Sequence, residues 1–113
     1  MNTKRLQEML AFWQPILRLQ DWDIEVRAVS RKSIDGDDGE CYAYPDIKEA
    51  EIKIVSGRPS SKFADHETIL VHELTHCHLE PIRTDENNAK VETATEAISK
   101  AFVGMVRRLN GKP

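Results

Sequence analysis

Two histidines lie four residues apart inside a segment expected to be helical, and this arrangement constrains the fold more than any other feature. Residues 72–76 read His-Glu-Leu-Thr-His. Residues 62–79 are expected to form the helix, with Ser60 or Ser61 as its N-cap and Pro81 just beyond its end. Residues four apart share one helix face, so both histidines must project from the same side.

The opposite side of this helix is apolar and is expected to pack against a core. Four residues fall on that side: Phe63, Leu70, Leu74 and Cys77. A helix with one apolar and one polar face is typical of a globular domain in which one side is buried. The histidines are therefore predicted to lie on the open side of a packed helix.

The other periodic segments predict the elements that form this core. A helix is expected near residues 3–19 with a break at Pro15, strands at 22–28, 40–44 and 51–55, a turn at 33–39, and a last helix at 85–109. The order helix, three strands, helix, helix predicts an α+β fold in one domain spanning residues 1–113. Its sheet is expected to be small and antiparallel.

Charge and hydropathy exclude several classes of function. The net charge is −3 and no basic stripe is present, so nucleic-acid binding is not expected. No apolar stretch is long enough to span a membrane, and residues 1–20 lack the features of a secretory signal, so a cytoplasmic location is expected. Cys41 and Cys77 are too few for a disulfide framework, although a single bridge between them remains open. The oligomeric state is not predicted.

The histidine pair predicts a metal site. Two imidazoles one helical turn apart can hold one Zn²⁺. Glu73 follows the first histidine, and its side chain is expected to turn toward a water molecule bound to the metal. We expect it to act as a general base that takes a proton from a water molecule whose pKa the metal lowers.

A catalytic zinc needs a third protein ligand and an open position. The candidates after the motif are His78, Glu80, Asp85, Glu86, Glu92 and Glu96. His78 points away from the metal face while the helix continues, and it is interpreted as an ordinary polar residue. Glu92 and Glu96 are four apart beside the apolar stripe of the last helix, so both should lean toward the helix that carries the histidines. One of them is the expected third ligand.

These residues resemble the zincin metallopeptidases, and most closely the gluzincin branch, in which H-E-x-x-H is followed by a metal-binding glutamate on a later helix. By that resemblance Glu92 is the third ligand and Glu96 a partner that orients His72, whereas the longer gap of larger gluzincins would select Glu96. From Trp22 onward the element order also resembles the compact minimal zincins of phage and prophage genomes. The resemblance implies a zinc peptidase whose peptide or protein substrate adds to an edge strand, either 50–55 or 40–44.

The chain departs from related patterns in two respects. The third histidine of metzincins and the later histidine of SprT-like proteases are missing. After the motif, the chain has no histidine or tyrosine of the kind that stabilises the oxyanion in larger gluzincins. Tyr42 and Tyr44 precede the motif and are alternatives for that role. We interpret both first as residues that pack in the core or at the edge of the sheet.

Three hypotheses of function remain. The first is a zinc peptidase, and the second is a zincin-fold binding or regulatory module that retains zinc without efficient catalysis. A closed structural zinc site would need four protein ligands, so Cys77 or His78 would have to join. Cys77 is expected to face the core and Glu73 is intact, which favours catalysis. The third hypothesis is hydrolysis of a non-peptide amide, which the sequence does not separate from the first.

Overall fold

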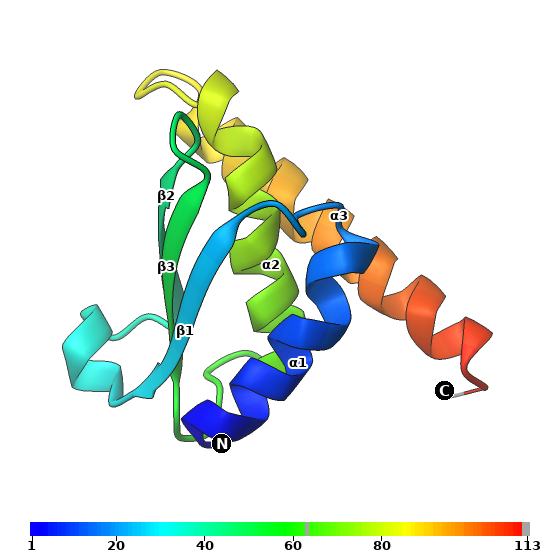
Figure 1. The fold of residues 1–113 in the computed structure, drawn as a ribbon. Coiled ribbons are helices and arrows are strands. Elements are labelled where there is room, and N and C mark those ends of the chain that lie inside the picture. Colours follow the sequence, from blue (N-terminus) through cyan, green and yellow to red (C-terminus); the bar gives the residue numbers. More distant parts are fainter. Residues whose placement is uncertain (63, 112–113) are drawn as a thin grey trace.

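The elements of the computed structural model, which describes residues 1–62 and 64–111, follow one another in the predicted order (Figure 1). Within those ranges the helices and strands are α1 (Thr3–Ile16), β1 (Asp23–Val29), β2 (Gly39–Tyr44), β3 (Glu49–Val55), α2 (His66–Leu79) and α3 (Asn88–Leu109). Short 3-10 helices span Arg31–Ile34 and Glu80–Ile82. The α+β fold class, with an N-terminal helix, a small sheet and a C-terminal helix, is confirmed.

The sheet is mixed, so the expectation of an antiparallel sheet was wrong. Its order is β1-β3-β2, with β3 parallel to β1 and antiparallel to β2. The chain passes from β1 to β2 and then turns back through residues 45–48, which brings β3 between the other two strands. Residues 50–55 therefore lie in the centre of the sheet and were wrongly considered as an edge. Strand β2 lies at one edge of the sheet, as one of the two alternatives predicted.

Helix α2 begins later than predicted, and Ser60, one of its two expected caps, binds elsewhere. The Asp65 side chain accepts a hydrogen bond from the backbone N–H of Thr68 at 2.9 Å and is the observed N-cap. Ser60 instead donates to Asp38, from its backbone N–H to Oδ1 and from its hydroxyl to Oδ2, both at 2.9 Å. Ser60 therefore binds the loop before β2 rather than starting the helix. Phe63, predicted on the apolar face, lies outside the described residues.

The last helix also starts later than predicted, at Asn88 rather than at residue 85. Thr84 and Asn87 bind each other across a turn: the Thr84 N–H donates to Asn87 Oδ1 at 2.7 Å, and the Asn87 N–H donates to the Thr84 hydroxyl oxygen at 3.2 Å. Such side-chain to backbone hydrogen bonds compete with helix formation. Pro15 is tolerated near the end of α1, which stops at Ile16.

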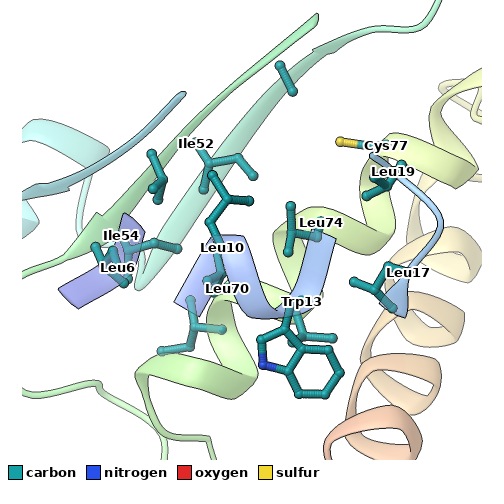
Figure 2. Packing of buried hydrophobic residues seen from close by; sticks show 14 of the residues in the cluster. Leu6, Leu10, Trp13, Leu17, Leu19, Ile52, Ile54, Leu70, Leu74 and Cys77 are labelled. Atoms are coloured by element: carbon teal, nitrogen blue, oxygen red, sulfur yellow. The ribbon is translucent and has the colours of Figure 1, made fainter. Parts of the chain in front are cut away.

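One hydrophobic cluster joins the apolar face of α2 to the sheet and to α1 (Figure 2). The predicted core residues Leu70, Leu74 and Cys77 all belong to it, together with Ile52 and Ile54 of β3. Helix α2 contacts β2 and β3 as well as α1 and α3, so it is the central helix of the fold (Figure 1). The helix is buried on most of its sides, with His76 and Glu73 included, so the prediction that the histidines lie on an open side holds only in that they border a pocket.

Helices α2 and α3 run antiparallel, and ion pairs join the end of α3 to the start of α2. Near the end of α3, Arg107 forms ion pairs with Asp65 and Glu67 at the start of α2. Glu67 also accepts a hydrogen bond from the indole N–H of Trp13 in α1 at 2.9 Å. This network links the end of α3 to the start of α2 and to α1, while the buried residues of α3 pack it against the rest of the fold.

The helices of the described chain include none that combines the length and the apolar character needed to cross a membrane.

Candidate metal centre

Two imidazoles and one carboxylate converge where α2 borders a pocket. The Nε2 atom of His72 lies 3.2 Å from Oε2 of Glu92, and Nε2 of His76 lies 2.8 Å from Oε1 of the same carboxylate. The candidate ligand atoms of these three residues all lie within 4.8 Å of one another. The geometry therefore brings together three groups that can bind one metal ion, two from α2 and one from α3.

Both imidazoles owe their positions to the spacing within α2. The two rings are one turn apart, with centroids 5.1 Å from each other and planes inclined by 71°. His76 is the more enclosed, with 8% of its surface exposed. Burial lowers the pKa of His76, and the negative charge of Glu92 opposes that shift. The lowered pKa favours the neutral imidazole, which is the form that binds a metal.

Glu73 lies beside this group and is also buried, with 7% of its surface exposed. Burial, followed by the negative charges of Glu92, Asp37 and Glu40, raises the pKa of Glu73 to about 8. Its carboxylate lines the same pocket as His72 and His76. None of the hydrogen bonds found among residues 1–62 and 64–111 involves that carboxylate. A buried carboxyl group with a strongly shifted pKa in a pocket is typical of a functional site.

The pocket has a volume of about 570 Å³ and runs between α2, α3 and the edge strand. Gly39 and Cys41 line it from β2, and Glu96 and Lys100 line it from α3. The metal-binding group is therefore reached from a cleft bordered on one side by the free edge of the sheet.

The other candidate ligands have different partners. Glu96 lines the pocket but forms an ion pair with Lys100 at 2.9 Å, and it does not belong to the converging group. His78 Nε2 lies 2.6 Å from the carbonyl oxygen of Leu17, on the side of α2 away from the metal-binding group. His66 contacts the carbonyl oxygen of Gly57 at 2.8 Å. These contacts agree with the interpretation of His78 as a polar residue outside the site.

Neither cysteine has a place in the converging group. Cys77 is buried in the core and Cys41 lies partly buried on β2, and both are free thiols, so the open possibility of a bridge between them is not realised. Tyr42 and Tyr44 are exposed on β2, and the part of the pocket formed by described residues includes neither.

Sequence reasoning did not assign several residues of the pocket to the site, among them Gly39 and Arg83. Arg83 is held by Glu80 at 2.8 Å and by Asn88 at 3.2 Å, and it follows the helix end where the pattern of apolar residues stops. Gly39 was interpreted only as the end of a glycine-rich turn. No local pattern marks either residue, because both reach the pocket through the packing of distant segments.

The buried Glu73 predicts a pH dependence of stability in the metal-free protein. An unfolded glutamate ionises near its ordinary pKa of 4.5, whereas the folded one ionises near 8. Between these values the folded state holds a proton that the unfolded state has released, so the free energy of unfolding falls as pH rises and levels off above about pH 8. The expected loss is on the order of a few kcal/mol.

Urea unfolding of the chelator-treated protein at several pH values across this window measures the effect. A Glu73→Gln variant has no carboxyl group to titrate and should show a much flatter profile. The same slope in the wild type and in the variant would contradict the assignment to Glu73.

No family model, no curated protein and no solved structure matches this chain.

Proposed function

We propose that the chain is a zinc-dependent peptidase of the zincin type. The observation that carries the proposal is the convergence of His72, His76 and Glu92 beside the buried carboxyl group of Glu73. Two imidazole nitrogens and one carboxylate oxygen are a ligand set of catalytic zinc sites, which keep a further position open. The group found in the described residues contains these three ligands and no fourth, which suits a catalytic site better than a closed structural one.

Zinc bound by these residues would supply a Lewis acid that lowers the pKa of water and polarises a carbonyl group. Glu73, whose ionised form the positive charge of the metal would favour, can then accept the proton of the attacking water. The same carboxyl group passes that proton to the nitrogen of the departing amine, which completes the cleavage of the amide bond. Its place in the pocket leaves the carboxylate free for both transfers, because no described side chain binds it.

The substrate in this proposal is an extended peptide or protein segment that pairs with β2. The carbonyl oxygen of Asp38 accepts a hydrogen bond from the N–H of Val55 at 2.8 Å. Hydrogen-bonded pairs alternate along an antiparallel ladder, so Glu40 and Tyr42 also direct their main chains toward β3. The main-chain groups of three residues therefore face the free edge: Gly39, Cys41 and Ala43. A peptide strand can pair with those groups without any requirement for particular side chains.

The test combines metal content with hydrolysis. Purified protein is analysed for zinc by mass spectrometry and then incubated with a quenched-fluorescence peptide library, with and without a zinc chelator. The proposal expects one zinc per chain, hydrolysis that the chelator stops, and recovery when zinc is returned.

Two results would contradict the proposal in different ways. Bound zinc without hydrolysis of any peptide would favour the binding or regulatory module, or an amide substrate other than a peptide. Failure to bind zinc when it is supplied would mean that the histidine pair is not a metal site.

A further inference from the structure

Gly39, the first residue of β2, approaches the Glu73 carboxylate so closely that a Cβ atom there would make an unusually tight contact. A Cβ atom placed on Gly39 would lie 3.2 Å from Glu73 Oε2, 3.0 Å from Ile69 Cγ2 and 3.2 Å from Ile54 Cδ1. Ordinary van der Waals contacts of a Cβ atom begin at about 3.4 Å. A Cβ atom on Gly57 or Gly104 would meet nothing within 4 Å, so this close approach is particular to Gly39.

Backbone conformation does not explain a glycine at this position. The glycines with positive φ in the described chain are Gly36 and Gly111, and Gly39 is not among them. Gly39 is an ordinary strand residue paired with Ile54 of β3. The absent side chain therefore matters for the space that it leaves, not for the φ angle that it permits.

The start of β2 is held firmly against the site. Arg31 donates to Oδ1 of Asp38 at 2.8 Å, and Ser60 binds both carboxylate oxygens of the same residue. The carbonyl oxygen of Asp38 is in turn bonded to Val55 in the centre of the sheet. The strand cannot easily retreat from α2 to make room for a methyl group on Gly39.

Of the three side chains that a methyl group would meet, Glu73 has the most rotatable bonds, although Ile69 Cγ2 would be met first, at 3.0 Å. Ile54 is fully buried and Ile69 is 6% exposed, and both belong to the hydrophobic cluster. The Glu73 carboxylate is the far end of a flexible side chain that borders the pocket. A methyl group at position 39 would therefore press on both Ile69 and Glu73, and the Glu73 carboxylate is the group that can rotate aside with less disturbance of the hydrophobic cluster.

We propose that Gly39 is a positioning residue for Glu73, and this inference rests on the function proposed above for its catalytic part. Its bare Cα closes one side of the space in which the carboxylate lies. The N–H and C=O of Gly39 face the free edge of β2, so the same residue would also bind the main chain of the peptide. One glycine thereby sets the distance between the proposed base and the bond to be cleaved.

The Gly39→Ala variant tests the positioning directly, with Gly57→Ala as a matched control for the general effect of an added methyl group on the unfolded chain. We expect Gly39→Ala to bind zinc as the wild type does. A crystal structure of the variant should show the Glu73 carboxylate displaced while His72, His76 and Glu92 superpose. If peptide hydrolysis is detected, kcat should fall by about 10–100-fold with KM little changed, since a 1 Å misplacement of a reacting group costs about 100-fold.

A stability measurement separates this inference from the question of peptidase activity. Gly39→Ala should lower the Tm of the metal-free protein, and the loss should be clearly smaller in a Glu73→Ala background, where the carboxylate is gone. Folding of the double variant when Gly39→Ala alone does not fold would support the same conclusion.

An equal loss of Tm in both backgrounds would overturn the proposal. So would an unmoved carboxylate, or a failure of both variants to fold, because the clash would then lie with Ile69 and Ile54. These results do not depend on hydrolysis, so a protein that cleaves no peptide would contradict the proposed function and still leave the positioning role testable.

Discussion

Glu73→Gln is expected to reduce kcat/KM for peptide hydrolysis by about 10²–10⁴-fold while leaving one zinc bound per chain. The amide occupies nearly the same volume as the carboxyl group, but it cannot accept the proton of the attacking water. Loss of a general base accounts for a reduction of this size. Because the side chain is not among the three proposed ligands, metal content should not change.

Hydrolysis and zinc content measured on the same preparations check this prediction. Glu96→Gln is the matched control, since Glu96 lines the same pocket but pairs with Lys100. It should retain most of the activity. Activity of Glu73→Gln close to that of the wild type would exclude Glu73 as the base, and equal losses in both variants would point to a general effect of the charge in the pocket.

Glu92→Ala is expected to weaken zinc binding by more than about 100-fold. Replacing groups that only support the ligands of a metal site already costs about 10–100-fold in affinity. Glu92 contacts both imidazoles through separate carboxylate oxygens, and its removal leaves the two histidines without a third ligand. Competition with a chromogenic chelator measures the change in affinity directly.

Glu96→Ala is the control for this second prediction, because Glu96 lies one turn further along α3 and belongs to a pair with Lys100. It should keep its zinc. The reverse pattern, with zinc lost from Glu96→Ala and kept by Glu92→Ala, would assign the third ligand to Glu96. Zinc retained by both variants would require a ligand outside the converging group.

Local patterns predicted the features of this protein that depend on neighbours in sequence. The pairing of His72 with His76 on one helix face follows from the helical repeat alone. The apolar face of α2 follows from the same repeat, and its described members lie in the core as expected. The α+β class followed from the order of helical and alternating segments.

Helix boundaries were predicted less well, because capping depends on which partner a polar side chain finds. Ser60 has the right chemistry for an N-cap, but it binds Asp38, which lies 22 positions earlier in the chain. Asp65 takes its place. The strand order failed for a related reason, since alternation of apolar residues shows which face is buried and not which strand is the neighbour.

Which of the two glutamates lies against the histidines depends on tertiary structure, and in this structure it is Glu92. Both residues lie on the same face of α3, one turn apart, and the sequence alone gave each a reason to be the ligand. The buried residues of α3 pack it against the rest of the fold in a register that brings Glu92 against the histidines, and the ion pairs of Arg107 with Asp65 and Glu67 accompany that register. The close approach of Gly39 to Glu73 has the same origin. The sequence by itself determined which side chains share a helix face, because that is local geometry, whereas the distances between segments depend on how the whole core packs.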